Sequence, residues 1–136
     1  MPWLNLYSSM SRDKVYIGYV LELGNGCYYV GISIGLNTRL LQHINNSNQS
    51  SKWVKLHKFK SVLSLEFIGK GETDKIAKQW ERTNTLRMMK KYGYDKVRGH
   101  CWTSSKPLKC CIPTGIPRIV DQNTENEDLL PHTSVS

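Results

Sequence analysis

Four side chains between residues 15 and 43 are of the types that phosphate chemistry uses. Tyr19 and Tyr29 are phenols, and Arg39 is a permanent cation whose forked guanidinium can clamp two phosphate oxygens. His43 can orient a phenol or a water, or relay a proton. These residue types indicate phosphate chemistry, provided that the fold brings them together.

A β-hairpin is expected to carry both tyrosines. Asn25-Gly26 lies between two runs of β-branched and aromatic residues, and both turn residues tolerate positive φ. A two-residue loop would put Tyr19 and Tyr29 on opposite faces of the sheet. A three-residue loop, Gly24-Asn25-Gly26 with Gly26 left-handed, would put them on one face. A shared site therefore requires an odd loop or an adjacent bulge.

A helix is predicted to begin near Leu36, where the apolar period changes from two to 3.6 residues. Leu36, Leu40 and Ile44 follow this helical spacing. At about 100° per residue, Arg39 and His43 lie side by side on the rim of the apolar stripe. The helix thus places a cation and an imidazole just beyond the hairpin.

The remaining elements predict a small α/β sandwich. Residues 52–60 form a short helix with Trp53 turned inward, and residues 61–68 form a third strand beside the hairpin. A long helix, capped by Thr73 or Asp74, runs to about Lys91. We expect a mainly antiparallel three-stranded sheet with the helices packed against it.

Glu81 falls on the inner stripe of that long helix, within about 40° of Ala77. A carboxylate there needs a partner, because burial of a charge is costly. Two interpretations stay open: an ion pair with a buried arginine, or a metal ligand that faces the hairpin. Mg²⁺ commonly uses one or two protein carboxylates and keeps several waters, so a single glutamate suffices.

The order and spacing of these residues resemble the GIY-YIG nuclease family. Ile17-Gly18-Tyr19 stands where the family usually has Gly-Ile-Tyr, and Tyr29-Val30-Gly31 stands for the second triplet, followed by Arg39 and His43. The resemblance covers roughly residues 15–102. Within the family, the chain is similar to small stand-alone members from large DNA viruses and some microbes. It continues in residues 52–58, in Trp80-Glu81 with Thr85, and in residues 92–99.

The resemblance implies a metal-dependent endonuclease that hydrolyses DNA phosphodiester bonds. Tyr19 would be the general base or lie next to it, with Tyr29 beside it and Mg²⁺ or Mn²⁺ on Glu81. A phenol has an ordinary pKa of about 10, so cations or metal-bound water would have to lower it. Both phenols are expected to point at Glu81 and at Arg39 with His43.

A second interpretation is a catalytically silent nucleic-acid-binding module, which the altered first triplet favours. The family often places an asparagine after the last helix, and residues 97–100 contain none. Arg98, in that segment, is a candidate phosphate contact instead.

The basic charge of the chain favours a polyanionic partner. The formal net charge is +8, and residues 107–136 hold two basic residues against four acidic ones, so the positive charge belongs to the first 106 residues. DNA is the expected partner, with RNA as an alternative. The short helix could be a solvated face or a phosphate contact. The candidate nucleic-acid contacts are Lys52, Lys55, His57, Lys58 and Arg98.

Three segments are expected: an N-terminal arm over residues 1–14, a nuclease-like domain over residues 15–106 and a flexible tail over residues 107–136. No apolar run approaches the ~20 residues that a membrane span needs, and we expect neither a membrane partner nor a targeting segment. Four cysteines make a poor disulfide framework, which favours a reducing compartment such as cytoplasm or nucleus. A zinc site of His100, Cys101, Cys110 and Cys111 is disfavoured by their spacing.

Overall fold

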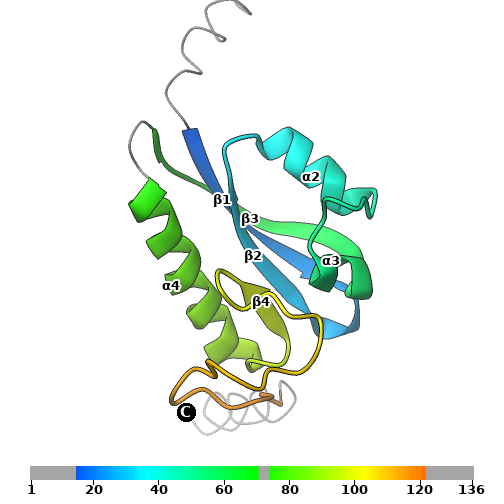
Figure 1. Cartoon of the computed structure of the whole chain (residues 1–136), viewed down its shortest axis with the longest axis vertical. Coiled ribbons are helices and arrows are strands. Elements are labelled where there is room, and N and C mark those ends of the chain that lie inside the picture. The colour runs from blue at the N-terminus through cyan, green and yellow to red at the C-terminus, as the bar shows by residue number, and fades with distance from the viewer. Residues whose placement is uncertain (1–14, 71–73, 122–136) are drawn as a thin grey trace, which may run out of the picture.

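The computed structural model describes residues 15–70 and 74–121, which build one sheet with helices on both faces (Figure 1). The sheet order is β3-β1-β2-β4. Its strands are β1 (Val15–Leu23), β2 (Tyr28–Ser33), β3 (Phe59–Lys70) and β4 (Val97–Gly99). The helices are α2 (Leu36–Ile44), α3 (Lys52–His57) and α4 (Asp74–Tyr92), with a single 3₁₀ turn η1 (Gly24–Gly26) between β1 and β2.

The hairpin has the three-residue loop that a shared tyrosine site requires. Tyr19 pairs with Gly31 across β1 and β2, so that Tyr19 and Tyr29 face the same side of the sheet. The loop is closed by the Leu23 amide, which donates to the Cys27 carbonyl at 2.8 Å. Gly26 is left-handed, with a φ of 68°, and Asn25 has a φ of 61°. The prediction of an odd loop is confirmed.

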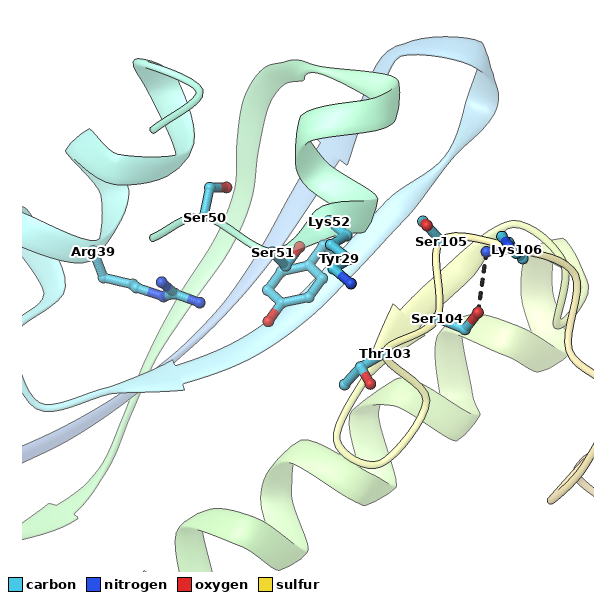
Figure 2. Close-up of a pocket in the computed structure, with 9 residues that line it drawn as sticks. All are labelled: Tyr29, Arg39, Ser50, Ser51, Lys52, Thr103, Ser104, Ser105 and Lys106. Atoms are coloured by element: carbon cyan, nitrogen blue, oxygen red, sulfur yellow. Dashed lines mark hydrogen bonds between the residues drawn. The ribbon is translucent and has the colours of Figure 1, made fainter. Parts of the chain in front are cut away.

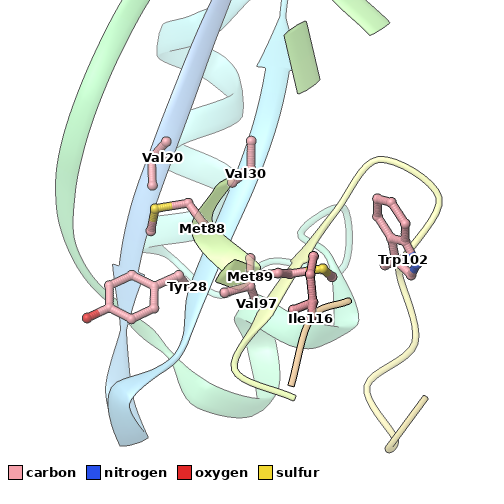
Figure 3. Close-up of a cluster of buried hydrophobic side chains, with 8 residues drawn as sticks. All are labelled: Val20, Tyr28, Val30, Met88, Met89, Val97, Trp102 and Ile116. Atoms are coloured by element: carbon pink, nitrogen blue, oxygen red, sulfur yellow. The ribbon is translucent and has the colours of Figure 1, made fainter. Parts of the chain in front are cut away.

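Two separate clusters pack on the two faces of the sheet. On one face α3 and the start of α2 cover Tyr19, Leu21, Leu23, Cys27 and Tyr29, with Trp53 and Val54 fully enclosed. On the other face α4 covers even-numbered residues of β1 and β2 together with Val97 of β4 (Figure 3); this cluster consists of Val20, Tyr28, Val30, Met88, Met89, Val97, Trp102 and Ile116. Strand alternation therefore assigns neighbouring residues to different cores.

Gly18 and Trp80 show why the first triplet has its glycine in the middle. A Cβ at Gly18 would lie 2.4 Å from ring atoms of Trp80, which packs over the strand from α4. Tyr19, the next residue, faces the opposite side. The altered order of the triplet thus serves the packing of α4 and leaves the tyrosine on the other face.

The expectation of a mainly antiparallel three-stranded sheet is wrong. The sheet has four strands and is mixed, because β4 pairs parallel to β2 over Tyr28–Val30. β4 has three residues, which is too few to show an alternating pattern. A parallel partner also becomes adjacent only after a long connection, which here runs through α2, α3, β3 and α4.

The predicted tail does not begin at residue 107. Ile116 is 8% exposed and belongs to the α4 cluster. The carbonyls of Pro117 and Arg118 accept hydrogen bonds from the backbone amides of Tyr94 and Asp95. The packed domain therefore extends to residue 121. The predicted arm over residues 1–14, and residues 122–136 of the tail, lie outside the described residues.

The predictions for α2 and α4 agree with the structure, whereas the short helix predicted over residues 52–60 ends at His57, and Phe59 and Lys60 belong to β3. α2 begins at Leu36, and α4 ends where Gly93 adopts a φ of 96° and donates to the Met89 carbonyl. Among residues 15–70 and 74–121, no helix combines the length and apolar character needed to cross a membrane.

Candidate active site

Tyr19 and Tyr29 meet on the α2 side of the sheet, with ring centroids 6.3 Å apart. Gly31 makes this possible. A Cβ at Gly31 would lie 2.4 Å from the Tyr19 hydroxyl oxygen, so the phenol can lie across the strand only because this position lacks a side chain. The glycine of the second triplet therefore has a steric role in the site.

His43 joins Tyr19 to Ser50 in a buried network. The Tyr19 hydroxyl lies 3.0 Å from Nε2 of His43, and the Ser50 hydroxyl lies 2.7 Å from Nδ1. His43 has no exposed surface, and burial with the nearby charge of Arg39 lowers its pKa to about 4. The imidazole is therefore neutral at pH 7. One of its nitrogens donates a hydrogen bond and the other accepts one.

Burial raises the pKa of both tyrosines. For Tyr19 burial is the largest cause, and Tyr29 adds to it, while the charge of Arg39 acts in the opposite direction. For Tyr29 burial again outweighs Arg39. The expectation that neighbouring protein cations lower the phenol pKa is wrong, because burial raises the pKa by more than the charge of Arg39 lowers it. Both phenols are protonated at neutral pH.

Arg39 lies on the wall of a pocket of about 640 Å³ that Tyr29 also lines (Figure 2). The guanidinium points toward the Tyr29 ring. It also donates to the side chain of Gln42 and to the carbonyl of Gln49, which fix its orientation. The lining residues include three cations and no carboxylate: Tyr29, Arg39, Ser50, Ser51, Lys52, Thr103, Ser104, Ser105 and Lys106.

Glu81 lies on α4, which covers the face of the sheet away from α2 and the tyrosines (Figure 1). β2 pairs with β4 only as far as Val30, so the edge of β2 is open beside Gly31. α4 passes the end of β4 close to this opening, because a Cβ at Gly99 would lie 2.6 Å from the Thr85 hydroxyl, one turn after Glu81. The Glu81 charge contributes to raising the pKa of both tyrosines.

The partner of Glu81 is His100 rather than a buried arginine. A carboxylate oxygen of Glu81 lies 3.4 Å from Nδ1 of His100, and the two side chains are 17% and 25% exposed. Burial raises the pKa of Glu81, and His100 opposes that shift. The sequence analysis considered His100 only for zinc. Its position just after a short strand gave no signal that it would meet α4.

The donor set at Glu81 suits a hard divalent ion that keeps most of its waters. Within residues 15–70 and 74–121, no group of three or more histidine, cysteine or acidic side chains is placed to hold a metal. A single partly buried carboxylate matches the way Mg²⁺ is bound with few protein ligands. Cys101, Cys110 and Cys111 are exposed free thiols.

Of the predicted nucleic-acid contacts on α3, Lys52 alone lines the pocket. Lys55 donates to the side chain of Asn48, and Lys58 is exposed beyond the end of the helix. His57 packs edge-on against Trp53 and receives a hydrogen bond from the Asn25 amide at 3.2 Å. These three residues lie outside the pocket wall, and His57 joins α3 to the hairpin loop.

Arg98 is not placed to contact a phosphate, which corrects the expectation from the sequence. It is 1% exposed, and its guanidinium lies 4.3 Å from the Trp53 ring centroid. Its donors are taken by backbone carbonyls of Tyr94, Val97, Ser104 and Lys106. A charge-rich segment after the last helix indicated a surface contact, whereas the side chain turns inward to satisfy a loop.

The sequence analysis missed Ser50 and the loop of residues 103–106. Ser50 stands in a polar run that reads as a turn, and the loop follows a strand too short to recognise. A signal for the loop exists in its composition, because Thr103-Ser104-Ser105-Lys106 joins three hydroxyls to a cation. Only the parallel pairing of β4 with β2 brings that segment to the pocket.

Comparison with known protein families identifies the domain. The GIY-YIG catalytic domain matches residues 14–92, which is more than half of the chain and contains both triplets, Arg39, His43 and Glu81. Comparisons with curated proteins and with solved structures gave no match. The chain belongs to the GIY-YIG family of nucleases.

Proposed function

We propose that this protein is a metal-dependent endonuclease that hydrolyses DNA phosphodiester bonds in the pocket beside Tyr29. The observation that carries the proposal is the buried Tyr19, His43 and Ser50 network next to Arg39. This network combines a proton acceptor with a nearby cation in a buried position, where perturbed titratable groups are typical of functional sites.

Tyr19 is the proposed general base, and its raised pKa dictates how it acts. A protonated phenol can take a proton from water only if it gives up its own. His43 is neutral, and its Nε2 lies within hydrogen-bond distance of the Tyr19 oxygen. In the proposed step, water attacks phosphorus, the bond between phosphorus and the leaving oxygen breaks, and the attacking water gives its proton to the Tyr19 oxygen. The phenol proton passes to His43 Nε2, and Nδ1–H donates to Ser50.

Arg39 and Glu81 supply the charge that the transition state needs. Arg39 remains protonated and can hold two oxygens of the scissile phosphate through its fork. A divalent ion held by Glu81 would stabilise charge on the phosphate and on the leaving oxygen. Tyr29 lines the pocket together with Arg39, and in this proposal its hydroxyl orients the attacking water.

A silent nucleic-acid-binding module is the second candidate, and a specific observation favours it. Tyr19 is 1% exposed, and burial raises its pKa by more than the charge of Arg39 lowers it. A pocket with three cations would bind a phosphate backbone without cutting it. The two functions therefore differ in turnover and not in binding.

A plasmid-nicking assay with Mg²⁺, repeated on Glu81→Ala, separates the two. We expect the parent to nick DNA, with loss of activity on chelation. We expect the variant to bind DNA nearly as tightly while cleavage is abolished, because the change removes the metal ligand and leaves the basic pocket intact. Equal nicking by both proteins would remove Glu81 from the site. Absence of nicking by the parent would favour the silent module.

A further inference from the structure

We propose that Lys52 and the loop of residues 103–106 form a second phosphate subsite, which holds the phosphate next to the scissile one on the same DNA strand. This inference rests on the proposed function for the position of the scissile phosphate. The subsite would fix the path of the strand across the pocket. The residues of this subsite would position the DNA, and they are separate from the residues proposed to cleave it.

The pocket has two walls on either side of Tyr29 (Figure 2). One wall carries Arg39 and Ser50, which belong to the network around Tyr19. The other carries the loop of residues 103–106, and Lys52 stands at the start of α3 beside Tyr29. A phosphate clamped by Arg39 leaves the second wall available to a neighbouring part of the same strand.

The second wall has the chemistry of a phosphate site. Lys52 and Lys106 are exposed cations, and Thr103 and Ser105 add hydroxyl donors. No carboxylate lines the pocket. Lysine and hydroxyl side chains are common contacts to the phosphates and sugars of DNA, where they fix the register of the strand without reading its sequence.

Arg98 ties the two parts of the second wall into one unit. Its guanidinium stacks on Trp53, the neighbour of Lys52 in α3, and donates to the carbonyls of Ser104 at 2.8 Å and Lys106 at 3.1 Å. Trp53 is itself fixed through a 2.9 Å hydrogen bond to the Tyr28 carbonyl in β2. Arg98 is therefore a positioning residue.

These contacts of Arg98 give a role to its buried charge, which the proposed reaction does not use. Burial lowers the pKa of Arg98, which records the cost of removing a guanidinium from water. The hydrogen bonds to the loop offset that cost and hold Lys106 at the pocket. We therefore infer that the position of the loop of residues 103–106, which Arg98 holds, matters for binding.

The test is the salt dependence of binding to a short fluorescent DNA duplex, measured by anisotropy without metal so that no cleavage occurs. The proteins are the parent, Lys52→Met, Lys106→Met, the double variant and Lys109→Met. Lys109 is the matched control, since it is an exposed lysine outside the pocket. All the substitutions lie on the surface and keep the fold.

The slope of log affinity against log salt is negative, and each pocket variant should make it less steep by about 1. The double variant should make it less steep by about 2. Lys109→Met should leave the slope unchanged. A double variant whose slope falls by no more than that of Lys109→Met would overturn the subsite.

The nicking assay keeps this result separate from the proposed function. A parent that binds with the expected slopes and does not nick would sustain the subsite and remove the nuclease. A parent that nicks, with slopes that match Lys109→Met, would do the reverse. For a parent that nicks, a duplex with one neutral methylphosphonate beside the mapped cut should bind the parent more weakly and leave the double variant unaffected. Equal weakening of both proteins would overturn the subsite.

Discussion

Tyr28 and Tyr29 are adjacent in sequence and equally buried, yet they belong to different regions of the molecule. Each is 9% exposed. Tyr28 stacks on Tyr92 with centroids 4.0 Å apart, inside the apolar cluster under α4. Tyr29 lies 5.4 Å from the His43 ring and lines the pocket that contains Arg39. Strand alternation alone sends one phenol to a packing core and the other to a site.

The comparison teaches that burial does not separate a functional tyrosine from a structural one. The α2 face combines phenols with an imidazole, a guanidinium and a buried serine. The α4 face combines them with valine and methionine. Burial raises the pKa of Tyr28 and of Tyr29 alike. What distinguishes the two residues is the set of polar partners on each face.

The largest test of this comparison is the pair Tyr19→Phe and Tyr28→Phe. Tyr19→Phe removes the hydroxyl that connects the attacking water to His43, and we expect nicking to fall by about 10²- to 10⁴-fold, the usual contribution of general base catalysis. Tyr28→Phe should leave the rate within about twofold, because its ring stacking remains. Initial rates on supercoiled plasmid measure both.

Duplex affinity serves as the control for the tyrosine pair, because neither substitution removes one of the three cations that line the pocket. Both variants should bind DNA as the parent does. Equal rates for the two variants would erase the functional distinction between the two faces.

Local pattern was sufficient to predict most of the elements, and it failed where contacts between distant segments decide the structure. The hairpin loop, the start of α2 and the span of α4 follow from turn residues and apolar spacing. β4 is a strand only because Val97–Gly99 meets β2 after the α4 crossover. Ile116 lies between Pro113 and Pro117 in a segment without a helical or strand period, so the sequence did not predict that it packs against α4.

The candidate site divides in the same way. The residues that carry the family pattern could be named from the sequence because their spacing is local to one hairpin and one helix. His100, Ser50 and the loop of residues 103–106 could not, since each reaches the site from a separate segment. Arg98 was assigned to the surface on charge alone, whereas four backbone carbonyls and a tryptophan ring hold it inside.

A smaller effect is expected for Arg39→Lys, which keeps the charge of the α2 face and removes the fork. A lysine cannot hold two phosphate oxygens in the same plane, so we expect nicking to fall by about 10- to 100-fold, the equivalent of one charge-assisted hydrogen bond of ~1.5–3 kcal/mol. Cleavage rates at saturating DNA measure the loss, and the salt slope of binding should stay unchanged. Full turnover in the variant would reduce Arg39 to a binding charge.

The smallest effect concerns the stability of the α2 face at mildly acidic pH. His43 has a pKa of about 4 in the folded protein against 6.5 for an ordinary histidine, because of burial and the charge of Arg39. Between these two values the unfolded chain binds a proton that the folded chain does not. The free energy of unfolding should therefore fall as the pH drops from 6.5 to 4, by up to about 3 kcal/mol from this residue.

Urea unfolding of the parent and of His43→Gln, at pH values from about 7.5 down to 4, isolates this contribution. Glutamine does not titrate, so the stability of the variant should depend less steeply on pH in this window. His57 also has a lowered pKa, through burial and the charges of Lys96 and Arg98, but it is present in both proteins and its contribution cancels.

The apolar cluster under α4 contains no group that titrates between pH 4 and 6.5. A difference in slope between the two proteins would therefore assign the acid sensitivity to the face that carries the proposed chemistry. Parallel curves would mean that His43 does not change protonation on unfolding, and that it is free to be charged beside Tyr19 in the folded protein.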